Sequence, residues 1–410
     1  MLIQSEQLNL DQKIHSSQCL GCAANAVQVL IRSGDLAPSN RFSTDLVSRE
    51  DCHPLRVGQC MQCGLLQLVS PMPSAVVRPR HAWITYSEPE QHLDALVMRL
   101  LQKTDRSARI FGITTNDDST LNRLNLAGRK NTYRFDIRSD LEVDAPYAGL
   151  ESIQSAFAPE LTDALVARHG TADLLIVRYL LEHAHSPRAF LAEISRLLAP
   201  DGRMVVEVPA CNKFVDACDY SLLWEEHITY FSRRTFSETL RCAGFEVLEM
   251  IVSEYSLEDS LIAIVAKNRI DPVDEEDGLV GELRAGQVFS ETFEATKTGY
   301  RKYLGDLHGR GKRIALFGAG HFAAMFLNLF DLGDQVDCVI DDNASKQGLL
   351  MPGTLIPILG SERLSECDIC LLALNPETEK RIVSKFGAFE RDGGEFISIF
   401  SCSPLALELS

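Results

Sequence analysis

Two pairs of cysteines near the N-terminus have the spacing of metal-binding turns: Cys19-Leu-Gly-Cys22 and Cys60-Met-Gln-Cys63. A CxxC turn lets two thiolates face one ion, and two such turns complete a closed tetrahedral site. Because four soft sulfur ligands leave no open coordination position, the spacing predicts structural zinc rather than catalytic zinc. The alternatives are a redox pair or unrelated buried cysteines, and the doubled spacing favours zinc.

Other cysteines are not predicted to bind this ion. Cys52 lies near the two pairs, but four cysteines already fill the site. A third pair, Cys367-Asp-Ile-Cys370, runs into an apolar segment. In an extended strand, residues three apart point to opposite faces, so joint chelation is awkward and a core position is predicted.

Polar side chains that could bind a cofactor follow two strand-like runs. The loop Ile113-Thr-Thr-Asn-Asp-Asp-Ser-Thr-Leu121 lies where an α/β domain cradles its ligand, but it contains no GxGxxG pattern. Asp136 ends the next run. An acid at such a position binds the two hydroxyls of a ribose or caps a helix, and the residues alone leave both open.

A glycine-rich turn lies near the C-terminus. Phe317-Gly-Ala-Gly-His-Phe322 joins a strand-like run to a helix, and Asp341 ends the next strand-like run. Such a turn exposes backbone N–H groups to a phosphate. The alternative is a tight packing turn that binds nothing, and NAD is not predicted.

Alternating strands and helices must position these residues. Strand candidates with amphipathic helices between them are 108–113, 132–135, 173–177 and 204–208. Parallel strands need crossovers of this length, so a doubly wound α/β domain is predicted. The runs 245–251 and 260–266 predict a closing hairpin, which is how class I methyltransferase domains end.

Helix signals divide the chain further. Ser87 with Glu90, and Thr235 with Glu238, have the spacing of capping boxes. After an acidic linker, a long helix over 280–307 leads to strands at 313–317 and 336–340. The predicted domains are a zinc-binding module (1–85), a methyltransferase-like domain (86–268), and a linker helix with a Rossmann-like α/β domain (269–410).

Composition limits the partners. The chain has 410 residues, and 40 basic against 57 acidic residues give a net charge of −17, which repels nucleic acid and anionic membrane. We expect no transmembrane helix and no signal peptide, because neither an 18-residue apolar run nor a basic n-region is present. Twelve cysteines are too few for a disulfide scaffold, so a reducing cytoplasm is the expected location.

The segment Trp224-Glu-Glu-His-Ile-Thr-Tyr-Phe-Ser232 resembles the Y-H-E-H-x-x-Y-F-S signature of the sugar C-methyltransferases, which act on nucleotide-linked deoxy-keto-sugars. The resemblance covers nearly the whole chain. The other segments that resemble the family are the cysteine pairs, Leu36-Ala-Pro-Ser-Asn40, Arg178-Tyr-Leu-Leu-Glu-His183, Glu207-Val-Pro209, and Asp341 to Gly348.

The resemblance implies removal of a proton next to a ketone, followed by attack of the enolate on the methyl group of S-adenosylmethionine. His227 falls on the family's base, Glu226 on the acid beside it, and His183 on a second polar position. From the residues alone, His183 is equally a helix-start residue. The implied cofactor-binding residues are Thr114, Asn116, Asp117 and Asp136.

Four positions depart from the family pattern. Thr114 and Asp118 replace glycines, Trp224 replaces a tyrosine, and Tyr179 replaces an asparagine. Asp118 places a carboxylate where the carboxylate of the cofactor would lie, which predicts weak binding and tenfold tighter binding by Asp118→Gly. The sequence therefore predicts a C-methyltransferase. The alternatives are an acid–base enzyme without methyl transfer and a non-catalytic binding subunit.

Overall fold

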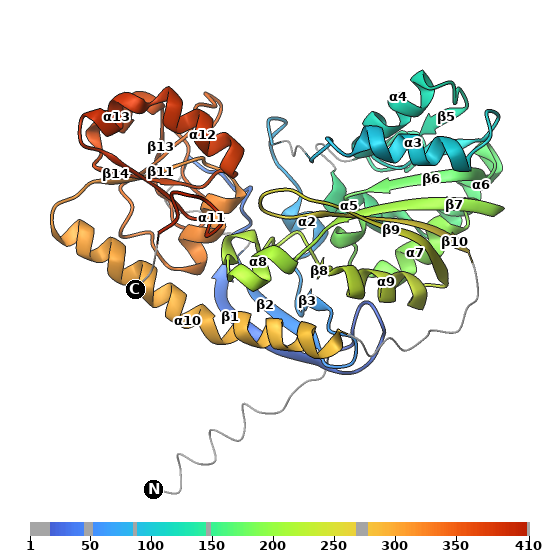
Figure 1. The fold of residues 1–410 in the computed structure, drawn as a ribbon, viewed down its shortest axis with the longest axis horizontal. Coiled ribbons are helices and arrows are strands. Elements are labelled where there is room, and N and C mark those ends of the chain that lie inside the picture. The colour runs from blue at the N-terminus through green and yellow to red at the C-terminus, as the bar shows by residue number, and fades with distance from the viewer. Residues whose placement is uncertain (1–16, 45–51, 85–87, 145–148, 268–277, 408–410) are drawn as a thin grey trace, which may run out of the picture.

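The computed structural model describes residues 17–44, 52–84, 88–144, 149–267 and 278–407. They form three sheets (Figure 1), of which the central and C-terminal ones are flanked by helices. Among these residues, no helix has the length and apolarity needed to cross a membrane.

The N-terminal sheet is antiparallel and has the order β1-β2-β3-β8. Its strands are β1 (Val27–Leu36), β2 (His53–Cys60), β3 (Leu66–Leu68) and β8 (Thr229–Tyr230). Strand β8 belongs to the segment that resembles the family signature, and Tyr230 pairs with Leu66. The N-terminal sheet, which contains the second cysteine turn between β2 and β3, therefore also fixes the signature segment.

The central sheet has the order β5-β4-β6-β7-β10-β9. Its strands are β4 (Ile110–Gly112), β5 (Thr132–Arg134), β6 (Ala172–Arg178), β7 (Leu198–Pro209), β9 (Phe245–Ser253) and β10 (Ser260–Lys267). The first four are parallel, and β10 runs antiparallel to both of its neighbours. The predicted doubly wound sheet with a closing hairpin is confirmed.

Helices cover both faces of this sheet because its strands are apolar on both sides. Alternate residues of β6 show this: Leu174 and Ile176 pack with α3 (Leu93–Lys103) and α4 (Asp118–Leu126). Leu175 and Val177 belong to the opposite cluster. That cluster includes side chains of α6 (Pro159–His169), α7 (Pro187–Ser195) and α9 (Arg233–Cys242).

Two helix starts differ from the sequence prediction. The cap of α9 is Ser232, not Thr235: the Ser232 hydroxyl accepts from the Thr235 amide at 3.1 Å, and the Ser232 amide donates to the Thr235 hydroxyl. Ser87 lies outside the described residues, and α3 begins at Leu93 without a side-chain cap.

The C-terminal sheet is parallel, with the order β13-β12-β11-β14-β15. Its elements are β11 (Ile314–Phe317), α11 (His321–Leu329), β12 (Cys338–Ile340), β13 (Ile358–Leu359), β14 (Ile369–Leu372), α12 (Pro376–Lys385), α13 (Gly387–Arg391) and β15 (Glu395–Ser398). Cys370 is fully buried in β14, which confirms its predicted core position, whereas Cys367 is half-buried and precedes the strand, so the core prediction was wrong for that residue.

The long helix α10 (Leu279–Gly309) joins the C-terminal domain to the rest (Figure 1). The Ser290 hydroxyl donates to the backbone oxygen of Leu30 in β1 at 2.7 Å. One buried cluster contains Leu66, Phe289 and Phe326, so the N-terminal sheet, α10 and the C-terminal domain share a core. The remaining short helices are α2 (Ser74–Val77), α5 (Leu150–Ile153) and α8 (Asn212–Ala217).

Candidate functional site

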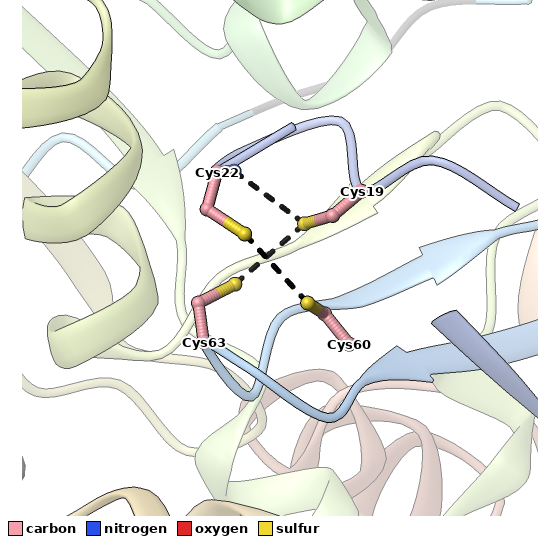
Figure 2. A group of neighbouring side chains, drawn as sticks. All are labelled: Cys19, Cys22, Cys60 and Cys63. Atoms are coloured by element: carbon pink, nitrogen blue, oxygen red, sulfur yellow. Dashed lines mark hydrogen bonds between the residues drawn. The ribbon is translucent and has the colours of Figure 1, made fainter. Parts of the chain in front are cut away.

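The four predicted zinc ligands converge on one point (Figure 2). The sulfur atoms of Cys19 and Cys63 are 3.6 Å apart, and those of Cys22 and Cys60 are 3.7 Å apart. With zinc–sulfur bonds of 2.3 Å, tetrahedral ligands lie about 3.8 Å apart. The arrangement of the sulfurs therefore fits zinc.

The turn after the second cysteine pair needs glycine. Gly64 has φ +82°, and a Cβ there would lie 2.9 Å from the Cβ of Glu282 in α10. The Arg234 guanidinium of α9 donates to the backbone oxygen of Cys63 at 2.5 Å. The cysteine cluster is thereby fastened to two helices of other parts of the chain.

The predicted base His227 lies beside His183. Their ring centroids are 4.8 Å apart at 86°, and Nδ1 of His183 lies 3.0 Å from the backbone oxygen of Glu226. The Ile228 amide donates to the Glu182 backbone oxygen at 2.7 Å, which joins the two segments. The structure thus brings together the predicted catalytic residues.

Burial keeps both imidazoles neutral. It lowers the pKa of His183 to about 4, against a weaker opposing effect of its hydrogen bond to Glu226. Burial, with the neighbouring His183 and His321, lowers the pKa of His227 well below its ordinary range. Both rings are therefore unprotonated at neutral pH and keep a ring-nitrogen lone pair, and the lowered pKa makes each imidazole a weaker base than usual.

Glu182 is a neighbour that the sequence analysis missed. It is 1% exposed, and neither carboxyl oxygen has a hydrogen-bond partner among the described residues. Three atoms lie close together here: a carboxyl oxygen of Glu182, a ring nitrogen of His183 and a ring nitrogen of His227. Each is within 4.8 Å of the other two. Burial raises the pKa of Glu182 far above its ordinary value, so the group stays neutral. The only feature of the sequence that could have identified Glu182 as a site residue is its position next to His183.

The predicted acid Glu226 faces the N-terminal module. Its carboxylate accepts from the Asn40 amide at 3.1 Å, and the neighbouring Glu225 accepts from the Ser39 backbone N–H at 2.6 Å. All four residues are buried. The Leu36–Asn40 segment, which the sequence analysis used only as a family marker, therefore holds the signature segment.

The C-terminal domain contributes His321 to the same place. Its ring stacks on Trp224 with a centroid distance of 3.5 Å and an angle of 3°. Nδ1 of His321 lies 2.9 Å from the Ser39 hydroxyl. Sequence reasoning missed this contact, because His321 stood out only as part of a glycine-rich turn.

That turn has its own internal partners. The Ala319 amide donates to Asp341 at 2.9 Å, and the Lys346 ammonium lies 3.0 Å from the same carboxylate oxygen. Asp341 thus holds the turn after β11 in place.

Asp117 organises the predicted cofactor loop. Its buried carboxylate accepts from the amides of Ile113, Thr114 and Arg178 at 2.7 to 2.9 Å. Gly112 makes room for it, because a Cβ at that position would lie 2.8 Å from the Cβ of Asp117. Burial raises the pKa of Asp117 to about 7 despite these bonds. Asp117 therefore shapes the loop from within.

The other three predicted cofactor residues, Thr114, Asn116 and Asp136, differ in burial and in their hydrogen-bond partners. The side-chain nitrogen of Asn116 is buried and has no hydrogen-bond partner within the described part of the chain. Thr114 is 1% exposed and accepts from the Asn116 amide. Asp136 is exposed, and Ser139 and Arg138 donate to only one of its oxygens. An unpaired amide donor and an accessible carboxylate fit the polar ends of S-adenosylmethionine.

A cavity of about 60 Å³ lies against the histidines and is lined by Tyr179, Trp224, Glu226, His227 and others. It shares Tyr179 and Trp224 with a cleft of about 880 Å³. Both the central and the C-terminal domains line that cleft, which also has Glu88 and Glu258 in its wall. Burial raises the pKa of Glu88 to about 7 and that of Glu258 to about 8.

Comparisons with known proteins agree with this architecture. The family model "Methyltransferase domain" matches residues 87–250, and "C-methyltransferase C-terminal domain" matches residues 269–400. The C-methyltransferase NovU of Streptomyces niveus is 24% identical over 371 residues, covering 85% of this chain and 86% of NovU. The class so defined is that of S-adenosylmethionine-dependent methyltransferases. Within it, the chain is similar to the C-methyltransferases, as the resemblance predicts.

Two solved structures are more distant. A 1,6-didemethyltoxoflavin-N1-methyltransferase of Burkholderia thailandensis has a TM-score of 0.29 at 16% identity, covering 43% of this chain and 77% of its own. The magnesium protoporphyrin IX methyltransferase of Synechocystis PCC 6803 has a TM-score of 0.31 at 16% identity, covering 44% and 83%.

Proposed function

We propose that this protein methylates a carbon next to a carbonyl group in a nucleotide-linked sugar or a related specialised metabolite. The observation that carries the proposal is the pair of adjacent neutral imidazoles, of buried His183 and half-buried His227, against a cavity that adjoins the interdomain cleft. Neutral imidazoles accept protons, and the cleft has room for a small-molecule substrate.

In the proposed reaction, His227 removes the proton next to the carbonyl, which leaves an enolate on the substrate. His183 lies edge-on to His227, and the backbone oxygen of Glu226 orients its ring. Glu226, held by Asn40, is the acid beside the base. S-adenosylmethionine, when bound, supplies an electrophilic methyl group.

The proposal includes two bound groups, S-adenosylmethionine and a zinc ion. The side-chain amide of Asn116 and the carboxylate of Asp136 would hold S-adenosylmethionine. Thr114 and Asp117 would shape the loop that carries Asn116. A zinc ion would be held by the four cysteines of Figure 2, and its role would be structural because four sulfur ligands close the site.

The test is a methyl-transfer assay with isotopically labelled S-adenosylmethionine and a dTDP-linked 4-keto-6-deoxyglucose as the probe substrate. We expect the wild type to form a new carbon–carbon bond next to the ketone. His227→Ala should slow this reaction by about 10²-fold or more, the usual contribution of a general base. His308→Ala, in the last turn of α10, is the control and should keep wild-type activity.

Two results would contradict the proposal and favour its alternatives. Exchange of the α-proton without methyl transfer would indicate an acid–base enzyme. Absence of both reactions, together with retained binding of the sugar nucleotide, would indicate a binding subunit.

A further inference from the structure

The buried carboxyl of Glu182 lacks the partner that such a group needs. Its side chain is 1% exposed, and neither of its oxygens has a hydrogen-bond partner among the described residues. Buried polar atoms are nearly always paired, and a bound ion is one of the groups that can satisfy an exception. We therefore asked which neighbours of Glu182 could bind an ion together with it.

Two imidazoles lie beside this carboxyl. One ligand atom of each of Glu182, His183 and His227 lies within 4.8 Å of the other two. Glu182 and His183 belong to the short 3-10 turn Leu181–His183 after β6, whereas His227 comes from the signature segment. The Ile228 amide donates to the Glu182 backbone oxygen at 2.7 Å, so a backbone hydrogen bond holds the two segments together.

A hydrogen bond prepares the ring of His183 for a ligand. Its Nδ1 lies 3.0 Å from the backbone oxygen of Glu226. Because a carbonyl oxygen can only accept, Nδ1 carries the ring proton, and the lone pair of the neutral ring is on Nε2. Metal-binding histidines are oriented in this way, with the second ring nitrogen donating to a backbone carbonyl or a carboxylate.

The ring of His227 is positioned by neighbouring rings. It lies edge-on to His183, and it stacks on Trp224 with a centroid distance of 5.3 Å and an angle of 16°. Both histidines line the cavity of about 60 Å³ that adjoins the interdomain cleft. An ion between them can therefore also bind water in that cavity.

Two imidazole nitrogens and one carboxylate oxygen are a ligand set for a divalent transition metal ion. Catalytic zinc and non-haem iron sites use this set and keep positions open to water. Zinc bonds of about 2.1 Å place tetrahedral ligands about 3.4 Å apart. Since the three atoms lie within 4.8 Å of one another, they need to approach by about 1.4 Å at most. The ion replaces the proton of Glu182, because a ligating carboxylate is ionised.

We propose that Glu182, His183 and His227 form a second metal site, which binds a divalent transition metal ion and leaves positions open toward the cavity. The four-cysteine cluster is closed and would keep its zinc during purification, whereas this open site would fill from added metal. A neutral imidazole has one lone pair, so an ion on His227 excludes an α-proton from it. Metal binding stands without the proposed function, and inhibition of that reaction by the metal rests on it.

The test titrates the full chain, with zinc in its cysteine cluster, with Co²⁺ and follows visible absorption. We expect about one further equivalent to bind, without the strong near-ultraviolet bands of thiolate ligation. Glu182→Gln should weaken this binding by about 10²-fold or more, because the loss of an outer-shell partner alone costs 10- to 100-fold. The glutamine side chain has the shape of the protonated acid, so the variant should fold. Glu160→Gln, at an exposed position of α6, should bind Co²⁺ like the wild type.

Three results would overturn this inference. They are no Co²⁺ bound beyond the cysteine cluster, thiolate bands from the added Co²⁺, and equal affinity in Glu182→Gln and the wild type. Methyl transfer to the dTDP-linked probe should also stop when Co²⁺ fills the site, and continued transfer would exclude His227 as a ligand. No methyl transfer with or without Co²⁺ would contradict the proposed function alone, because the absorption measurement does not depend on it.

Discussion

At the residue scale, Asp118 shows how a side chain's direction alters its expected effect. Its position matches a glycine of the family loop, but its carboxylate lies 2.7 Å from the Arg134 guanidinium. The pair is partly exposed, and such pairs contribute roughly 0–1 kcal/mol to stability. Because Arg134 neutralises the carboxylate, Asp118 opposes an anionic group of the cofactor less than the sequence predicts.

We therefore expect Asp118→Gly to change the affinity for S-adenosylmethionine by less than tenfold, measured by isothermal titration calorimetry. Asp118→Asn removes the charge but keeps the Cβ, and it should behave like the glycine variant. Tenfold or greater tightening in Asp118→Gly alone would mean that the Cβ blocks the cofactor.

At the element scale, the two cysteine turns fix the strands that follow them. The first turn leads into β1, and the second joins β2 to β3, which pairs with β8 and so with the signature segment. Removing zinc from a closed site leaves thiolates that must take up protons, so metal loss destabilises such modules. Because β3 carries β8, we expect the effect to reach the histidines.

Metal analysis of the purified protein should find about one zinc per chain. Cys60→Ser should abolish zinc binding and lower the thermal midpoint, whereas Cys52→Ser, a cysteine outside the cluster, should keep both. Stoichiometric zinc in both Cys19→Ser and Cys60→Ser would contradict the ligand assignment.

At the scale of the whole molecule, the central and C-terminal domains together line the cleft, and burial raises the pKa of carboxyl groups in its wall. The pKa of Glu258 rises to about 8 because of burial and the neighbouring Glu88. A raised pKa contributes stability that is complete below the ordinary value of about 4.5 and lost as the pH rises through 8. Alkaline pH should therefore destabilise the protein.

Replacing Glu258 by glutamine should remove this loss, because the amide stays neutral. Urea unfolding at pH 6 and pH 9 should show a smaller fall in unfolding free energy for Glu258→Gln than for the wild type. We expect a difference of at least about 1.4 kcal/mol, which one pKa unit represents. Glu390→Gln, at an exposed position of α13, should match the wild type at both pH values. Equal falls in all three proteins would contradict the assignment.

Features that depend on local spacing could be predicted from the sequence. The two cysteines of each pair are three residues apart, and a CxxC turn of this length brings its two thiolates together. The alternating apolar runs determined the doubly wound sheet and its hairpin, because strand and helix periodicities are properties of short segments. The signature segment around His227 indicated the resemblance to the C-methyltransferases.

Contacts between side chains from distant segments could not be predicted from the sequence. The stack of His321 on Trp224, the bond from Asn40 to Glu226, and the contact of Tyr255 with His92 each join residues 97 or more positions apart. Periodicity carries no information about such pairs, because they form when separate sheets and α10 pack on a shared core. The Glu182 carboxyl, which has no hydrogen-bond partner within the described part of the chain, also becomes evident only in the tertiary structure, since burial depends on everything packed around it.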